Sequence, residues 1–390
     1  MSTIDAGVTA ITLTEDDLGS HVTHAPTRVL LTGSGLPADG ALFTFEPLRT
    51  AGLRTLADAA ERPARLAEEL RDRLVIGELL GPASGLRESI LLDGRTGEIT
   101  TTHLRAPGGC RPLAPSLTVL LRFAAATEEL AALRGRFASL AGRHGVRTAT
   151  EASRRLLRLF EEDTDGRVPP YWKVAALIRP LALTAGPGTD SGLTLDVPAR
   201  LMNEEFGPGR MVRFEEVDFP AALTHEPTRR FLRETGLPED ADVFHFDFDT
   251  DVPLPTLRDH RTVERAGEHP LEPGDALPAH SDRLIRLGRL VEDNSLVVDG
   301  TTGAVLTFSE PEGTLEALNT DVSTLAFTLW LLHRERALDS DLGGELTSVY
   351  DQLAATMLQV LASYDTTGTA PGTGWHYWTE VFRDEAGGTL

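Results

Sequence analysis

The chain has 390 residues, of which 41% are hydrophobic, enough for two packed domains of ordinary size. Its single cysteine, Cys110, excludes a disulfide framework within the chain and a cysteine-rich zinc site. The net charge of −22 argues against nucleic acid as a partner, because phosphates are bound by basic surfaces. We expect a cytoplasmic protein without a membrane partner, because no N-terminal signal peptide is evident and the most apolar run, 325–332, is too short to span a bilayer.

An internal repeat organises the chain. Residues 23–37, THAPTRVLLTGSGLP, return about 200 residues later as 224–238, THEPTRRFLRETGLP. A second pair follows in the same order, LLDGRTGEI at 91–99 and VVDGTTGAV at 297–305. Repeats on this scale indicate duplicated domains. We predict tandem domains at 1–185 and 186–390, joined within the Gly-, Pro- and Ser-containing segment 183–194.

The same succession of elements is predicted in both copies. In the first copy the patterns predict a helix at 24–34, strands at 41–46 and 74–80, a hairpin at 88–104, and helices at 115–133 and 150–162. In the second copy they predict a helix at 225–235, strands at 243–248 and 283–291, a hairpin at 295–308, a buried helix starting at Asn319, Thr320 or Asp321, an amphipathic helix at 346–365 and a short C-terminal helix. Strands grouped before helices predict an α+β fold, in two tandem copies of an antiparallel or mixed sheet packed by helices.

Local signals mark the ends of these elements. Thr224 is expected to cap the helix at 225–235, and Gly236 to end it. In the hairpin at 295–308, we expect Gly300 and Gly303 to adopt positive φ in the turn and bulge.

The sequence contains no Walker loop, no GxGxxG after a strand, and no HExxH, GxSxG or paired CxxC motif, so we predict a protein that is not an enzyme and needs no cofactor or metal. His24 and His225 occupy matched positions and are expected to be helix-start residues rather than ligands. The Asp-Gly-x-Thr-Gly segments at Asp93 and Asp299 have one acid each, which favours hairpin turns over calcium loops.

Charge differs sharply between the copies. Residues 1–185 carry 22 basic and 22 acidic side chains, whereas residues 186–390 carry 15 and 37. The acidic second copy favours a basic protein partner, with solubility as the alternative explanation. The candidate partner-binding residues are acids of the segments 246–255 and 308–316, expected to be exposed acidic loops, and two C-terminal tryptophans: Asp247, Asp249, Asp251, Glu310, Glu312, Trp375 and Trp378. For the tryptophans, packing in the core is the alternative to a role as binding anchors.

The second copy resembles a known family. The succession of THEPTRRFLRETGLP, VFHFDF, DRLIRLGRLVEDNSLVVDGTTGAV and LNTDVSTLAFTLWLLHRERAL is similar to the SUKH superfamily of Smi1/Knr4-like domains, and most to its fourth group, the bacterial SUKH-4 immunity proteins frequent in actinobacteria. The resemblance covers most of 200–390 and, more weakly, 10–180. One lysine among 37 basic residues also indicates a GC-rich bacterial source.

The resemblance implies a non-enzymatic protein that binds and neutralises a toxin of a bacterial polymorphic toxin system, of nuclease or deaminase type, by occlusion. A basic toxin would suit the acidic second copy. The first copy departs from the pattern, because LAPSLTVLLRF replaces LNTDVSTLAF, and Arg105 and Arg111 stand where we align Glu310 and Glu312. An intracellular scaffold or regulatory module is the alternative, and an enzyme would require a deep pocket of titratable groups.

Overall fold

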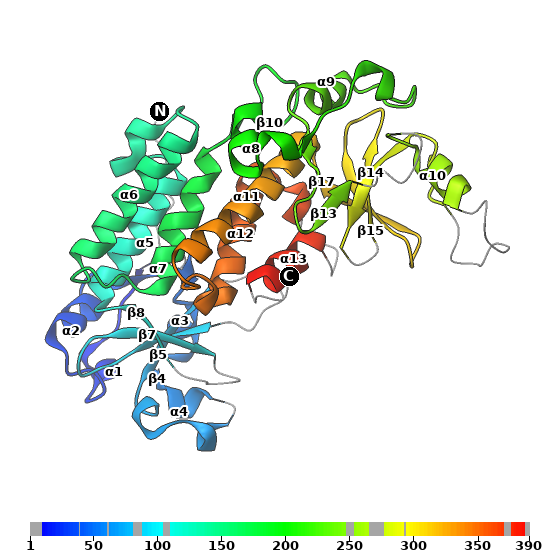
Figure 1. Ribbon diagram of the computed structural model, residues 1–390. Helices are drawn as coiled ribbons and strands as arrows, with labels where there is room; N and C mark the ends of the chain where they lie inside the picture. The colour runs from blue at the N-terminus through cyan, green and yellow to red at the C-terminus, as the bar shows by residue number, and fades with distance from the viewer. Residues whose placement is uncertain are drawn as a thin grey trace, which may run out of the picture. The chain divides into compact units, whose positions relative to one another are not determined.

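The computed structural model describes residues 10–38, 40–60, 62–80, 88–103, 110–246, 253–264, 277–291, 294–369 and 376–386. The chain divides into two units, one of Met1–Ala141 with Glu151–Leu177 and one of Gly142–Thr150 with Ile178–Leu390. Each unit combines an antiparallel sheet with helices, which confirms the predicted α+β class (Figure 1). No helix within the described ranges is long and apolar enough to cross a membrane.

The first unit is built on one main sheet. Its elements are β1 (Ala10–Ile11), α1 (Glu15–Leu18), α2 (Ala25–Thr32), β2 (Leu36–Pro37), β3 (Phe43–Thr44), α3 (Glu46–Ala51), β4 (Arg54–Thr55), α4 (Leu56–Ala59), β5 (Leu74–Leu79), β6 (Glu88–Leu92), β7 (Ile99–His103), β8 (Arg111–Ala114), α5 (Leu117–Ala131), α7 (Pro170–Ile178) and most of α6 (Val146–Glu162). The strand order is β3-β5-β6-β7-β8, all antiparallel, and β4 pairs with the other end of β5. Rings of Phe123, Phe160 and Trp172, with centroids 4.5–5.4 Å apart, fill the core between the helices.

The second unit repeats this plan. Its elements are β9 (Gly186–Pro187), β10 (Leu195–Asp196), α8 (Ala199–Phe206), β11 (Met211–Val212), α9 (Glu226–Glu234), β12 (Leu237–Pro238), β13 (Phe244–Phe246), α10 (Leu257–Glu264), β14 (Leu284–Leu290), β15 (Asn294–Asp299), β16 (Val305–Ser309), β17 (Thr314–Asn319), α11 (Val322–Asp341), α12 (Tyr350–Tyr364) and α13 (Tyr377–Ala386). The main sheet has the order β13-β14-β15-β16-β17, with every pair antiparallel. The predicted strands, hairpin and three later helices are therefore present, while α8, α10 and β17 were not predicted.

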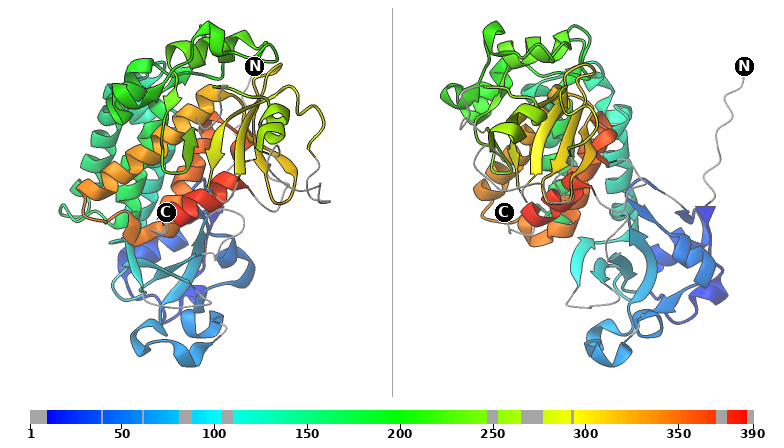
Figure 2. Two further views of the ribbon diagram at one scale, coloured as in Figure 1. Left: turned by 45° about the vertical axis from the view of Figure 1, so that its right-hand side comes forward. Right: turned by 90° about the vertical axis from the view of Figure 1, so that its right-hand side faces the viewer.

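Helices cover both faces of the second sheet. In Figures 1 and 2, α10 lies on one face and the long helices α11, α12 and α13 lie on the other. Leu257 of α10 packs against Val297 and Phe308 of the sheet. In the first unit Leu56 of α4 packs in the same way against Val75 and Leu91. Because helices cover both faces of this sheet, β15 is buried along its whole length.

The start of α11 agrees with the start predicted from the sequence. Asp321 is the N-cap, and its carboxylate accepts hydrogen bonds from the backbone N–H groups of Ser323 at 2.8 Å and Thr324 at 3.3 Å. The apolar run at 325–332 is buried throughout, as predicted. An apolar helix of this kind is stable in water only when packed on all sides.

The segment around the predicted join is ordered. β9 and β10 pair as a small antiparallel hairpin. Thr194 donates from its backbone N–H and its hydroxyl to the Asp321 carboxylate, both at 2.6 Å, and Leu195 N–H donates to Ser323 Oγ at 3.0 Å. This segment is therefore hydrogen-bonded to the start of α11 rather than forming a free linker.

Candidate functional site

The repeated helix motif and the repeated hairpin motif of the second unit contact each other. The backbone N–H groups of Thr224 and His225 both donate to the carbonyl of Gly300, at 2.7 and 2.8 Å. A β-carbon on Gly300 would lie 2.2 Å from the carbonyl oxygen of Ala222. Gly303 has φ of +79°, and a β-carbon there would lie 2.3 Å from His225 Nδ1. Gly303 thus adopts the expected positive φ, whereas Gly300, which does not, is required by close approach of the backbone.

The first unit contains the same junction. The N–H groups of Thr23 and His24 donate to the carbonyl of Gly94 at 2.7 and 2.9 Å. Gly97 has φ of +80°, and its β-carbon would lie 2.3 Å from His24 Nδ1. The two repeated motifs are therefore the two halves of one structural contact, present in both copies.

The matched histidines begin helices, as predicted. His225 is the N-cap of α9, and its Nδ1 lies 2.8 Å from Thr228 Oγ1; His24 and Thr27 repeat this pair at 2.8 Å. The expectation that Thr224 caps the helix was wrong by one residue. Its hydroxyl is directed to the hairpin, where it donates to the Gly300 carbonyl at 3.3 Å.

The Asp-Gly-x-Thr-Gly segments are hairpin turns, as expected. Asp299 accepts hydrogen bonds from the N–H groups of Thr301 at 2.9 Å and Thr302 at 3.0 Å. Asp93 accepts equivalent bonds at 2.8 and 3.0 Å. These carboxylates are engaged in holding the turns.

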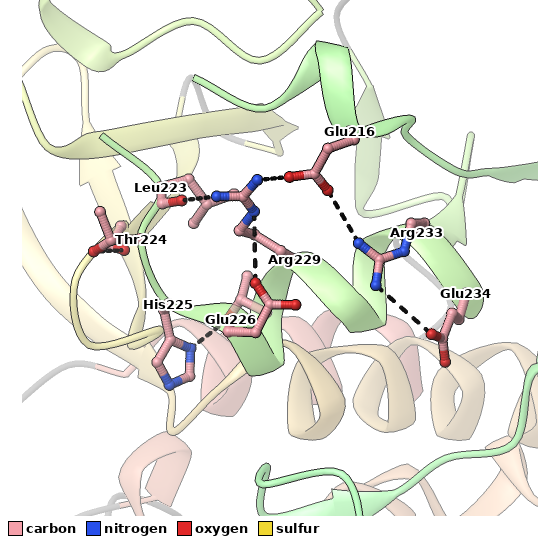
Figure 3. Close-up of polar contacts among 10 residues, drawn as sticks. Glu216, Leu223, Thr224, His225, Glu226, Arg229, Arg233 and Glu234 are labelled. Atoms are coloured by element: carbon pink, nitrogen blue, oxygen red, sulfur yellow. Dashed lines mark hydrogen bonds and ion pairs between the residues drawn. The ribbon is translucent and has the colours of Figure 1, made fainter. Parts of the chain in front are cut away.

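Several acids around α9 are engaged in ion pairs. Arg229 is paired with Glu216 and lies 3.8 Å from Glu226 (Figure 3). Arg233 reaches Glu216 at 3.1 Å and Glu234 at 3.8 Å. These exposed acids therefore have cations beside them, and such surface pairs add little to stability.

Of the predicted partner-binding residues, Asp247, Asp249, Asp251 and Trp375 lie outside the described residues. Trp378 lies in the core at 1% exposure, and its Nε1 donates to Asn319 Oδ1 at 3.0 Å. A buried indole with its N–H satisfied is a packing residue rather than part of an exposed surface.

Glu310 and Glu312 lie in the turn between β16 and β17, but they differ in environment. Glu310 is half-buried, accepts a hydrogen bond from Ser295 Oγ at 2.6 Å and is paired with Arg261. Glu312 is exposed. The two predicted acids share one turn, and Glu312 is the more exposed of them.

The expectation that 308–316 is an exposed loop was wrong. This segment holds the end of β16, a tight turn and the start of β17. Gly313 makes the turn at φ of +65°, with its N–H donating to the Ser309 carbonyl at 2.8 Å. The consequence is that Glu316 lies in the sheet, directly opposite Thr307.

A concave pocket of about 410 Å³ lies at this end of the sheet. It is lined by Asn294, Thr307, Ser309, Pro311, Glu312, Thr314 and Glu316. Asn294 and Thr307 are buried, with 5% and 3% exposure, whereas Pro311, Glu312 and Thr314 are exposed. The described lining residues offer carboxylate, hydroxyl and amide oxygens and include no cation, so the pocket is suited to hydrogen-bond donors that carry positive charge.

Comparison with protein-family models decides the family. The model described as SUKH-4 immunity protein matches residues 6–161 and again residues 197–384. The chain belongs to the SUKH-4 immunity protein family. The family resemblance and the tandem duplication are therefore confirmed, and the first SUKH-4 copy is matched despite its departures from the second. Comparisons with curated proteins and with solved structures give no match.

The LNTD segment of the second SUKH-4 copy, residues 318–321, has a structural role. Asn319 Nδ2 and the Thr320 N–H both donate to the carboxylate of Asp365 at 2.9 Å, while Asn319 Oδ1 accepts from Trp378. These bonds tie the end of β17 to the C-terminal helices. The first SUKH-4 copy lacks the asparagine, and Trp172 Nε1 donates instead to the backbone carbonyl of Leu113 at 2.8 Å.

Of the residues that line the pocket of the second SUKH-4 copy, sequence reasoning had named only Glu312 as a candidate. Asn294, Thr307 and Glu316 share the pocket because β17 pairs with β16, and β17 was not predicted. The available signal was the alternation in TLEALN, with Leu315 on the face that meets α10 and Glu316 on the opposite face.

Proposed function

We propose that this protein is an immunity protein, which binds a toxin of a bacterial polymorphic toxin system and neutralises it without catalysis. The observation that carries the proposal is the match of both copies to the SUKH-4 immunity protein family. The protein would act in the cytoplasm of the cell that makes the toxin, since that cell needs protection there.

We further propose that the toxin is basic, of nuclease or deaminase type, and that the second domain covers its active site. Residues 186–390 carry 37 acidic and 15 basic side chains, whereas the first copy is balanced. An acidic surface speeds encounter with a basic protein and makes that encounter sensitive to salt. Glu312 and Glu316, which line the pocket, support this surface better than Glu310, which is held by Ser295 and Arg261.

Co-expression tests the function directly. The full chain is expressed with the toxin domain encoded beside its gene, and survival of the host is compared with a strain that carries the toxin alone. We expect survival, together with a purified complex whose association rate falls as salt is raised. A host that dies despite abundant soluble protein would refute the immunity function. Capture of a host protein in place of a toxin would instead support a scaffold.

A further inference from the structure

The pocket of the second unit can be compared with the same place in the first. The strand register defines which residues correspond. Asn294 pairs with Ser309 in the second unit, as Glu88 pairs with His103 in the first. Thr307 pairs with Glu316 in the second unit, as Thr101 pairs with Arg111 in the first. Arg111 therefore corresponds to Glu316, and not to Glu310 or Glu312 as the sequences alone suggested; Arg105 lies outside the described residues.

In the first unit the position that corresponds to Glu316 is occupied by Arg111, whose guanidinium is bound within the unit. Arg111 donates to the Glu88 carboxylate at 2.7 Å, and His103 Nε2 lies 3.3 Å from the same oxygen. Glu88 is buried at 5% exposure. A buried carboxylate is stable here because a cation from the neighbouring part of the sheet is beside it.

In the second unit every member of that cluster is changed. Asn294, Ser309 and Glu316 replace Glu88, His103 and Arg111, so the cation is lost and an acid stands in its place.

The pocket also contains a buried group that needs a partner. Thr307 is 3% exposed and lines the pocket, and its Oγ1 has no hydrogen-bond partner among the described residues. Within the same described ranges, Glu312 and Glu316 are not seen in an ion pair. Buried polar groups are normally satisfied, and this unpartnered hydroxyl belongs to a residue of a pocket that two carboxylates also line, which indicates a ligand that donates hydrogen bonds.

We propose that this pocket binds an arginine side chain of the protein partner. A guanidinium presents five N–H donors and no acceptor in a planar array, which suits oxygens contributed by β15, β16 and β17 together. The first copy places an arginine at the corresponding position, which favours arginine over lysine. The inference rests on the proposed function for the identity of the partner, and it specifies the chemistry by which that partner is recognised.

Titration of the full chain tests the pocket without a toxin. The probes are N-acetyl-arginine methylamide, its uncharged analogue N-acetyl-citrulline methylamide, and N-acetyl-lysine methylamide, followed by the threonine methyl signals in NMR spectra. We expect arginine to shift the signals of Thr307 and Thr314, lysine to bind more weakly, and citrulline at least tenfold more weakly. Unmoved signals, or equal shifts with citrulline, would overturn the proposal.

Variants locate the binding. Glu316→Gln is expected to weaken arginine binding at least tenfold, whereas Glu239→Gln, at an exposed acid outside the pocket, leaves it unchanged. The double variant Asn294→Glu with Glu316→Arg recreates the ion pair of the first copy. We expect it to fold with an unchanged melting temperature and to bind no arginine probe. Probe binding that survives in this folded variant would overturn the proposal.

The survival assay separates this inference from the proposed function. Protection at full strength by Glu316→Gln, despite its lost probe binding, would show that the pocket does not hold the toxin's arginine, and the immunity function would stand. A wild-type chain that binds the arginine probe but protects against no toxin would refute the immunity function and leave the pocket intact.

Discussion

His225 Nδ1 occupies space that a side chain on Gly303 would need, because a β-carbon there would lie 2.3 Å from that nitrogen. His24 and Gly97 repeat the relationship in the first unit at 2.3 Å. The sequence motifs that reveal the duplication are thus conserved between the copies for a structural reason. Each helix motif fits the turn of its own hairpin.

Gly303→Ala should destabilise the second unit strongly. The alanine would need a positive φ, costing about 1 kcal/mol, and it would overlap His225, costing about 1–3 kcal/mol more. Gly343→Ala is the matched control, because its φ of +68° is similar but nothing lies within 4 Å of the added carbon. Urea unfolding measures both variants. Equal losses of stability would contradict the importance of the junction.

Trp378→Phe should cost about 1–3 kcal/mol of stability beyond the change in packing. The phenyl ring retains most of the buried surface but leaves the Asn319 Oδ1 acceptor without its 3.0 Å hydrogen bond. Tyr350→Phe, at a side chain with 44% exposure, is the control and should be nearly neutral. Thermal unfolding followed by circular dichroism would show the difference, and similar melting temperatures for the two variants would argue against a role for this bond.

Glu310→Gln should lower the stability of the fold, whereas Glu312→Gln should change only the binding of a partner. Glu310 is bonded to Ser295 and paired with Arg261, so its neutralisation is expected to cost about 1–3 kcal/mol. Glu312 is exposed, so its neutralisation should change stability by less than about 0.5 kcal/mol. The second variant should instead slow association with a basic partner at low salt. Denaturant titration and stopped-flow association would measure the two effects, and a reversed pattern would contradict the assignment.

Asp93 should make the first unit sensitive to acid. Burial opposes ionisation of this carboxyl, but the N–H groups of Thr96 and Arg95, with the charge of Arg73, together hold its pKa below the ordinary value. Because the folded-state pKa is lowered, the stabilisation is complete above the unfolded pKa of about 4 and disappears as pH falls through the folded pKa.

Asp93→Asn should therefore be less stable than the wild type at pH 7, and the gap should narrow below about pH 4. Unfolding of both proteins by urea at pH 7, 5 and 3 measures this gap. A gap that stays constant down to pH 3 would show that the carboxylate charge does not contribute.

Much of the fold could be predicted because its signals are local. The Asp-Gly-x-Thr-Gly turns, the start of α11 near Asp321 and the burial of 325–332 all follow from residues within a few positions of one another. The β17 strand was missed, although the alternation in TLEALN was a local signal for it. The Gly-, Pro- and Glu-containing segment before it is typical of a loop, and the strand is established by its pairing with β16.

The candidate site likewise has features that the sequence predicts and features that it does not predict. The sequence by itself determined that the chain is duplicated, that both copies are α+β and that the acidic excess belongs to the second, because repeats, periodicity and charge are properties of residue order. Only the tertiary structure decided that Trp378 is buried, that Glu310 is paired with Arg261, and that Thr307 and Glu316 share one pocket. Those outcomes depend on which distant strands and helices pack together, and packing of that kind is not recorded in any local pattern.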